Sequence, residues 1–139
     1  MYKTVITYGT FDLLHYGHLL LLKRCKQLGD KLIVGVSTDE MCLAKGKETK
    51  FKLNQRMELI SDLKYVDLVI PEYTMAQKVT DIEKYNVDIF VLGDDYKEKF
   101  KQMPEYNLIK DKVEIVFLER TPDISTTILK QLEGITNES

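Results

Sequence analysis

Cysteine is scarce in this chain of 139 residues, which contains only two. Cys25 and Cys42 match no metal-site spacing, and two cysteines are too few for a disulfide scaffold. We therefore expect two reduced thiols, as in a cytosolic protein. Long hydrophobic runs are also missing, because the longest in the first half, residues 19–22, is too short to span a bilayer. A strand-like run follows Met1 almost directly, with no signal sequence before it. We expect a soluble, cytoplasmic protein with no membrane partner.

An excess of charge of one sign is absent as well. The chain has 20 Lys and Arg against 22 Asp and Glu, a formal net charge of -2. Bulk electrostatic binding of nucleic acid needs a strongly basic surface, so we expect no nucleic-acid partner. An anionic ligand must then be held by a local group of basic residues. This favours a small molecule.

No internal repeat and no Pro-, Gly- or Ser-rich linker divides the chain, so we expect a single domain over residues 1–139. Strand-like runs lie at residues 3–8, 31–36, 66–70, 87–92 and 113–118, the third stopped by Pro71. Helical patterns lie at residues 16–28, 54–63, 74–85 and 125–132. Strands that alternate with helices predict right-handed crossovers and a parallel sheet. The predicted fold class is α/β, a Rossmann-like three-layer α/β/α arrangement with a five-stranded parallel sheet.

Two stretches are poorly explained by core packing. Residues 37–52 follow the second predicted strand, and residues 93–104 follow the fourth. In open α/β sheets, ligands bind beyond the carboxyl ends of the strands, where the strand order reverses. Both stretches are therefore expected at the ligand-binding face.

The two histidines of the chain stand three residues apart, after the sequence Tyr-Gly-Thr-Phe-Asp at residues 8–12. His15 and His18 share one face of a helix at its N-terminus, where free N–H groups and the dipole favour an anion. Their imidazoles can donate hydrogen bonds to phosphate, and Gly17 leaves room for it. The alternative is one surface histidine and one satisfied core histidine. A dinucleotide-binding Gly-x-Gly-x-x-Gly motif and a Walker A lysine loop are both absent.

Two further groups of charge follow predicted strands. Lys45 and Lys47 flank a glycine in the loop after the second strand, and can neutralise a triphosphate. Without the other motifs, a solvated charged loop would be the better interpretation. Asp94 and Asp95 follow the fourth strand. Their carboxylates suit ribose hydroxyls or Mg²⁺, or simply cap the loop.

A basic and hydroxyl-rich segment joins the last predicted strand to the last helix. Arg120 precedes three consecutive hydroxyl residues at 125–127. Ser125 or Thr126 is a natural N-cap, and a helix start lined by hydroxyls beside an arginine favours phosphate. Plain capping, the alternative, needs only one hydroxyl.

Three motifs carry a resemblance to a known family: Thr10-Phe11, His15-Tyr16-Gly17-His18, and Arg120 followed by Ile124-Ser125-Thr126-Thr127. Together they resemble the cytidylyltransferase branch of the nucleotidyltransferase superfamily. The His-x-Gly-His pattern marks the whole superfamily, and the arginine-to-hydroxyl segment narrows it to this branch. The resemblance spans nearly the full chain and is closest to bacterial enzymes that act on glycerol-3-phosphate.

The resemblance implies that CTP and a phosphorylated small alcohol, first of all glycerol-3-phosphate, give a CDP-alcohol and pyrophosphate. It implies that His15 and His18 stabilise the transition state, while Lys47 and Arg120 hold the triphosphate. The implied nucleotide site also contains Thr10, Phe11, Tyr16, Gly17, Asp94, Ile124, Ser125, Thr126 and Thr127. Lys45 and Lys78 match positions that contact the acceptor phosphate, although Lys78 by itself would be read as a solvated helix lysine. Mg²⁺ bound through the CTP phosphates and a homodimer are implied as well.

One departure from the family and two alternatives accompany this interpretation. Pro122-Asp123 replaces the usual Glu-Gly, which adds a negative charge and a Cβ near the expected triphosphate. The first alternative is an adenylyltransferase on the same fold, because the sequence does not display the groups that select the base. The second is a non-catalytic nucleotide-binding module. Such a module need not retain groups that act on the transition state.

Overall fold

A computed structural model describes residues 2–119, and the structural statements below concern this part of the chain. The strands are β1 (Thr4–Gly9), β2 (Lys31–Ser37), β3 (Leu68–Glu72), β4 (Ile89–Gly93) and β5 (Glu114–Leu118). The α-helices are α1 (Tyr16–Gln27), α2 (Asp39–Ala44), α3 (Leu53–Ser61), α4 (Gln77–Lys84), α5 (Lys97–Lys101) and α6 (Pro104–Ile109). A 3-10 turn, η1 (Asp94–Tyr96), connects β4 to α5.

The sheet confirms the predicted α/β class. Its order is β3-β2-β1-β4-β5, and every neighbouring pair is parallel. In the central register, Ile6 of β1 lies between Ile33 of β2 and Phe90 of β4. The chain moves outward from β1 to β3 and then returns to the other side of β1 for β4. The strand order therefore reverses between β1 and β4, which is where a ligand site is expected.

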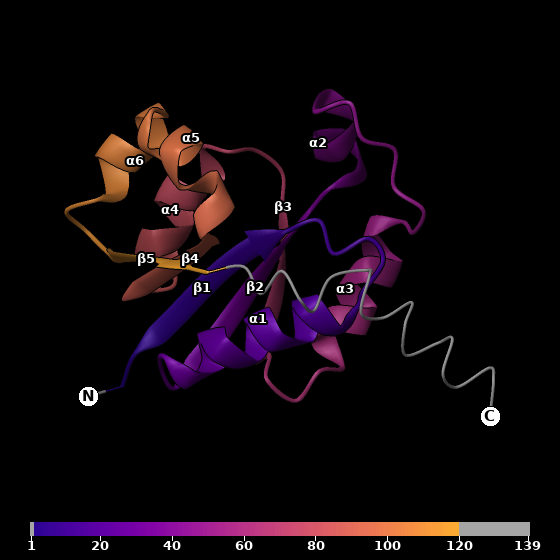
Figure 1. The fold of residues 1–139 in the computed structure, drawn as a ribbon, viewed down its shortest axis with the longest axis horizontal. Helices are drawn as coiled ribbons and strands as arrows, with labels where there is room; N and C mark the ends of the chain where they lie inside the picture. Colours follow the sequence, from indigo (N-terminus) through magenta and orange to yellow (C-terminus); the bar gives the residue numbers. More distant parts are fainter. Residues whose placement is uncertain (1, 120–139) are drawn as a thin grey trace.

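Helices cover both faces of the sheet, as Figure 1 shows. On one face, α1 and α3 pack through buried residues such as Leu22 and Ile60 against Val34 and its neighbours. On the other face, α4, α5 and α6 pack through Ile82, Phe100 and other apolar residues. The strands are apolar on both sides because each side meets a helical layer. This is the three-layer arrangement that the alternation of elements predicted.

Several element boundaries differ from the sequence-based prediction. The third strand was expected to stop at Pro71, but β3 continues through Pro71 to Glu72. Because β3 is an edge strand, a residue without an N–H is tolerated there. The helix expected at residues 74–85 begins only at Gln77, whose N–H donates a hydrogen bond to Thr74 Oγ1 at 3.2 Å. The expected helix at residues 125–132 lies outside the described residues.

The two stretches expected as loops contain short helices. Within residues 37–52, α2 begins after Thr38, whose hydroxyl accepts a hydrogen bond from the Met41 N–H at 3.1 Å. Within residues 93–104, η1 and α5 follow β4 directly. In Figure 1, α2 lies on one side of the upper strand ends and α5 with α6 on the other. These helices are too short to show a clear apolar period, so the sequence pattern did not reveal them.

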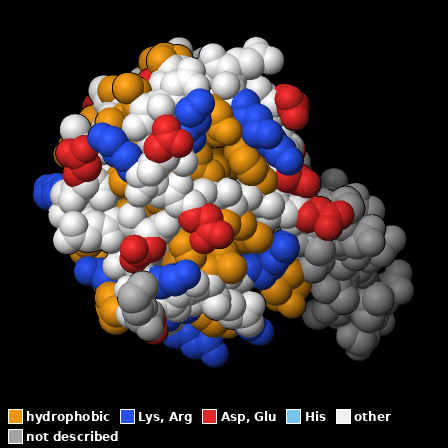
Figure 2. Space-filling view, turned by 90° about the vertical axis from the view of Figure 1, so that its left-hand side faces the viewer, with side chains coloured by type: hydrophobic (Ala, Val, Ile, Leu, Met, Phe, Trp, Pro, Cys, Tyr) orange, Lys and Arg blue, Asp and Glu red, His pale blue; other side chains and the backbone are white. Residues whose placement is uncertain are grey.

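The surface carries no dominant charge on the face shown in Figure 2, where Lys and Arg side chains alternate with Asp and Glu. None of the helices in residues 2–119 combines the length and the apolar character that crossing a membrane requires.

Candidate active site

A cavity of about 500 Å³ opens at the carboxyl ends of the strands. Its floor is formed by the ends of β1 and β4, including Thr7, Gly9 and Gly93. This is the point where the strand order reverses, in agreement with the expectation from the sequence. The cavity wall is contributed by residues on either side of this point: Tyr8, Thr10, Leu21, Ser37, Lys45, Lys47, Glu72, Met75, Lys78, Phe90, Val91, Leu92, Tyr96, Lys99 and Met103.

The two histidines lie at the start of α1 and are stacked on each other. Their ring centroids are 3.9 Å apart, with an angle of 24° between the planes. His15 is the N-cap, and its Nδ1 accepts a hydrogen bond from the Gly17 N–H at 3.0 Å. The Nδ1 of His18 accepts from the His15 N–H at 3.2 Å. A neutral imidazole that accepts at Nδ1 carries its proton on Nε2. Both rings therefore present an Nε2–H donor away from the backbone.

His18 is held in its neutral form. Burial against its neighbours and then the adjacent His15 lower the pKa of His18 from 6.5 to about 4. Phe11 contributes to this burial, since its ring meets that of His18 edge to face at 5.3 Å. At neutral pH, His18 is consequently a hydrogen-bond donor through Nε2 and not a cation.

The backbone between β1 and α1 is shaped to place Phe11 against the histidines. Phe11 is buried although it adopts a positive φ of 51°, which is uncommon for a residue with a Cβ. Its ring lies over Gly9, where an added Cβ would be 2.7 Å from Phe11 Cε2. Gly9 is therefore required for this close approach, and the strained turn fits a functional segment.

Two lysines lie at the rim of the cavity, after α2. Lys45 is the C-cap of α2, and Gly46 follows with a φ of 78°. This left-handed glycine turns the chain so that the Lys47 N–H bonds the Cys42 carbonyl at 2.9 Å. Lys45 and Lys47 are both exposed and line the cavity, so their ammonium groups are available to an anion.

Lys78 also lines the cavity, but it is not the solvated lysine that its position on a helix would suggest. Only 4% of the residue is exposed, and its Nζ is paired with the carboxylate of Glu72. The same Nζ lies 4.5 Å from the centre of the Tyr8 ring and 3.4 Å from the sulfur of Met75. A buried ammonium group is thus held at the wall of the cavity.

Arg56 connects the segments that surround the site. It is completely buried, and its Nη1 donates to the carbonyls of Thr10 at 2.8 Å and Ser37 at 2.7 Å. Its Nε donates to the Phe51 carbonyl at 2.9 Å, and its Nη2 to Asp39 Oδ1 at 2.7 Å. One guanidinium therefore joins the ends of β1 and β2 to the starts of α2 and α3.

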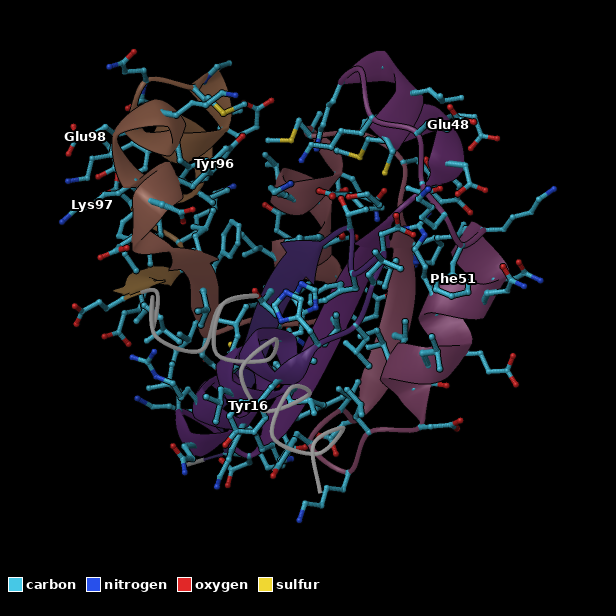
Figure 3. All side chains as sticks on the ribbon, turned by 45° about the vertical axis from the view of Figure 1, so that its right-hand side comes forward. Tyr16, Glu48, Phe51, Tyr96, Lys97 and Glu98 are labelled. Atoms are coloured by element: carbon cyan, nitrogen blue, oxygen red, sulfur yellow. The ribbon has the colours of Figure 1, made fainter. Side chains whose placement is uncertain are left out.

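Asp12 provides a second connection between the segment after β1 and the segment before α3. Its two carboxylate oxygens accept hydrogen bonds from the backbone N–H groups of Lys50 and Phe51, each at 2.8 Å. Figure 3 shows Phe51 beside the start of α3, where this connection is made. The end of the loop that carries Lys45 and Lys47 is therefore held by Asp12, through the Lys50 and Phe51 N–H groups, and by Arg56, through the Phe51 carbonyl.

The structure brings together part of the predicted site. Thr10, Lys45, Lys47 and Lys78 line the cavity, whereas His15, Tyr16 and His18 are not among its lining residues. The histidines occupy the neighbouring helix start, and Tyr16 is 50% exposed beside them. Asp94 is exposed at the beginning of η1. The predicted residues Arg120, Ile124, Ser125, Thr126 and Thr127, with Pro122 and Asp123, lie outside the described residues.

Sequence reasoning missed several residues of the cavity wall. Tyr96 and Lys99 come from the stretch at residues 93–104, which had been noted only as poorly explained by packing. Figure 3 shows Tyr96 on the inner side of this segment, while Lys97 and Glu98 point outward. Nothing in the sequence marked Glu72 as a residue of the site, since a single acidic residue after a predicted strand is common. Its burial becomes apparent only in the folded chain.

The described residues offer few side chains that could together coordinate a metal ion. Residues 2–119 contain no group of three or more His, Cys, Asp or Glu side chains that could hold one. Mg²⁺ commonly keeps several waters and binds through substrate phosphates and few carboxylates. The donor set is therefore compatible with Mg²⁺ that arrives on a nucleotide.

The fold and the site define an α/β protein with a ligand cavity at the carboxyl ends of its parallel strands, and comparison with known proteins identifies the family. The family model described as cytidylyltransferase-like matches residues 6–132. The chain is 49% identical to the glycerol-3-phosphate cytidylyltransferase of Staphylococcus aureus, over 93% of each chain. It is 50% identical to the enzyme of the same name from Bacillus subtilis, over 93% of this chain and 95% of the relative. The chain belongs to the cytidylyltransferase-like family.

Solved structures share the fold. A lipopolysaccharide core biosynthesis protein from Thermoplasma volcanium superposes with a TM-score of 0.68 at 31% identity, over 86% of this chain and 96% of that one. A nicotinate-nucleotide adenylyltransferase from Vibrio parahaemolyticus, described as putative, superposes with a TM-score of 0.64 at 18% identity, over 96% and 89%. The second likeness is evidence for the fold alone.

Proposed function

We propose that this chain transfers a cytidylyl group from CTP to glycerol-3-phosphate, giving CDP-glycerol and pyrophosphate. The similarity to two glycerol-3-phosphate cytidylyltransferases over most of the chain supports the substrates. The observation that carries the chemistry is the pair of stacked imidazoles, each of which accepts a hydrogen bond at Nδ1, beside a cavity lined by lysines. This arrangement places two imidazole donors next to a pocket lined by lysines.

The reaction is an in-line displacement at the α-phosphorus of CTP. An oxygen of the acceptor phosphate forms the new bond to the α-phosphorus. The bond from the α-phosphorus to the oxygen that joins the α- and β-phosphates of CTP breaks, and this oxygen leaves with pyrophosphate. The acceptor phosphate is already ionised near neutral pH, so no general base is required. Catalysis then depends on positioning and on stabilisation of the charge that develops on the α-phosphate oxygens. His15 and His18 are suited to donate their Nε2–H groups to these oxygens.

The basic residues are proposed to divide between the two substrates as the family resemblance implies. Lys45 and Lys78, which line the cavity, are proposed to contact the acceptor phosphate. Lys47 and Arg120 are proposed to hold the CTP triphosphate, with the segment at residues 124–127. Thr10, Phe11, Tyr16, Gly17 and Asp94 are proposed to complete the nucleotide site. Mg²⁺ would neutralise part of the triphosphate charge when it is bound through the β- and γ-phosphates.

We also propose a cytoplasmic homodimer. Both cysteines are buried and free, which suits a reducing compartment. Leu13, just before α1, is 55% exposed, and a second copy could cover it. Sedimentation equilibrium would measure the mass in solution, and a monomer at micromolar concentration would contradict the dimer.

A pyrophosphate-release panel tests the function directly. The enzyme is assayed with CTP or ATP and with glycerol-3-phosphate, glycerol-2-phosphate, phosphocholine or phosphoethanolamine. We expect CTP with glycerol-3-phosphate to give the highest kcat/KM, by at least about tenfold, because one lost polar contact has an effect of this size. A preference for ATP would indicate an adenylyltransferase. No acceptor-dependent release with any pair would indicate a non-catalytic module.

A further inference from the structure

The buried pair of Glu72 and Lys78 has no evident role in the fold. Glu72 ends the edge strand β3, and 1% of the residue is exposed, while Lys78 on α4 is 4% exposed. A buried ion pair contributes little net stability, because desolvation of both charges offsets their attraction, and apolar residues of similar size often do as well. The pair nevertheless lies at the wall of the cavity. Its position favours a role in ligand binding.

Glu72 is fixed from three directions. Its carboxylate Oε1 accepts a hydrogen bond from Ser37 Oγ at 3.2 Å, and Oε2 binds the ammonium group of Lys78. Its backbone carbonyl accepts from the Thr38 N–H at 2.9 Å. The carboxylate therefore has a defined position at the ends of β2 and β3, and through it Lys78 has one too. Among the described residues that line the cavity, Glu72 is the only acid.

Other groups around Lys78 do not replace this carboxylate. Tyr8, on β1, presents the face of its ring, and its hydroxyl donates to Asp81 at 2.8 Å. Glu105, on α6, and Lys45, after α2, act on the ammonium group only through their more distant charges. Of the side chains facing Lys78 from β1, β3, α2 and α6, only Glu72 is bonded to it and carries the opposite charge.

We propose that Glu72 is a positioning residue for acceptor binding, which holds the Lys78 ammonium at the cavity wall in its charged form. This inference rests on the proposed function, because it assumes that Lys78 contacts the acceptor phosphate. Without Glu72, the ammonium group of Lys78 would lose its proton more readily. Burial lowers the pKa of Lys78, and the Glu72 carboxylate and its hydrogen bond raise it, against the repulsion of Lys45. A neutral Lys78 would lose its attraction for a phosphate dianion.

The substitution Glu72→Gln tests the proposal, since it keeps the shape and removes the charge. We expect the KM for glycerol-3-phosphate to rise about tenfold or more at pH 8, the usual effect of losing a charge-assisted contact. The KM for CTP and kcat should change less than about twofold. The alkaline pH at which acceptor binding fails should fall by at least about one unit, as expected when a neighbouring opposite charge is removed. An unchanged pH profile and acceptor KM would overturn the proposal.

Three comparisons separate positioning from a structural role. Glu83→Gln removes an exposed carboxylate of α4, the helix that carries Lys78. Glu83 is paired with Lys112, and its replacement should leave the pH profile unchanged. Glu72→Asp should restore part of the acceptor affinity. In the double variant Glu72→Gln with Lys78→Ala, the acceptor KM should be no higher than in Lys78→Ala alone, because Glu72 acts through Lys78. Additive effects in the double variant would contradict the proposal.

A measurement without turnover distinguishes failure of this inference from failure of the proposed function. The Lys78 ¹⁵Nζ resonance, assigned by its loss in Lys78→Ala, gives the pKa of the ammonium group in the wild type and in Glu72→Gln. We expect a decrease of at least about one unit in the variant. A decrease in a protein that transfers no cytidylyl group would overturn the function and leave Glu72 as the group that holds Lys78 charged. An equal pKa in both proteins would overturn the inference itself.

Discussion

At the scale of single residues, the backbone determines what each histidine offers to a substrate. The Nδ1 atoms of His15 and His18 accept hydrogen bonds from N–H groups of the first turn of α1. This use of Nδ1 caps the helix and leaves Nε2–H as the outward donor. Gly17 supplies one of the N–H groups. The pair thus serves the helix and the proposed reaction through different nitrogen atoms.

Replacing His18 with Ala should lower kcat by at least about 10²-fold, because the donor acts on charge that develops in the transition state. The far-ultraviolet circular dichroism spectrum should remain that of the wild type. Steady-state kinetics with saturating CTP and acceptor measures the effect. Lys23→Ala, at an exposed position of the same helix, is the control and should retain normal turnover. Near-normal turnover in His18→Ala would remove His18 from the mechanism.

The lowered pKa of His18 predicts a pH dependence of stability. Its pKa is about 4 in the folded chain and 6.5 without the surrounding protein. Between these values the unfolded chain binds a proton that the folded chain does not, so stability falls as the pH falls from 6.5 toward 4. His18→Asn should therefore lose less stability than the wild type between pH 7 and pH 5. Urea unfolding at both pH values gives the comparison, and equal losses would show that His18 is not held neutral.

The residue scale also shows what the sequence could predict. The spacing of His15 and His18 predicted a shared face at a helix N-terminus, and the structure places them there. The burial of Lys78 was not predictable, because it depends on Glu72, six residues away on another element, and on Tyr8 from β1. Local spacing determines the first arrangement, whereas the second needs the packed sheet.

At the scale of elements, Arg56 holds four segments of the site together. Its charge also acts on Asp39, since the hydrogen bond from the guanidinium holds the pKa of that carboxyl below its usual value. The sequence pattern gave no indication of a role for Arg56. Four acceptors on separate segments converge on it only after β1, β2 and α3 have assembled. The same holds for α2 and α5, whose few residues depend on neighbours for stability.

Replacing Arg56 with Lys should reduce the free energy of unfolding by at least about 2 kcal/mol, because a lysine keeps the charge but cannot satisfy several acceptors in a fixed plane. Chemical denaturation measures the loss. Arg24→Lys is a matched control, since Arg24 makes one exposed hydrogen bond, to the Glu119 carbonyl at 2.8 Å. That change should cost less than about 0.5 kcal/mol. If the two variants were equally stable, the connecting role of Arg56 would be wrong.

At the scale of the whole molecule, the arrangement of the strands is more important for the position of the cavity than the exact residues at which each strand begins and ends. Most predicted strand boundaries moved by a residue or two, yet the parallel sheet followed from the alternation of strands and helices. Right-handed crossovers leave few arrangements for such a chain. The cavity at the reversal point was predictable in place for the same reason. The residues that line the cavity were not predictable, because they come from segments that lie far apart in the sequence.

Ligand-dependent thermal stability tests nucleotide choice and metal use on the intact chain. A ligand that binds only the folded state at 100 times its Kd stabilises by about 2.7 kcal/mol, which for a chain of this size raises Tm by roughly 8 °C. We expect this shift with CTP and Mg²⁺, and less than about a quarter of it with ATP and Mg²⁺ at the same concentrations.

The metal arms of the same experiment test where Mg²⁺ is held. Because residues 2–119 contain no cluster of metal ligands, Mg²⁺ alone should leave Tm unchanged. Removing the metal with EDTA should cut the CTP shift by at least about half, since Mg²⁺ bound through the phosphates offsets the repulsion among the triphosphate's own charges, and CTP without it binds less tightly. A shift with Mg²⁺ alone would indicate a metal site within the protein. Equal shifts with ATP and CTP would contradict the cytidylyl assignment and favour an adenylyltransferase on the same fold.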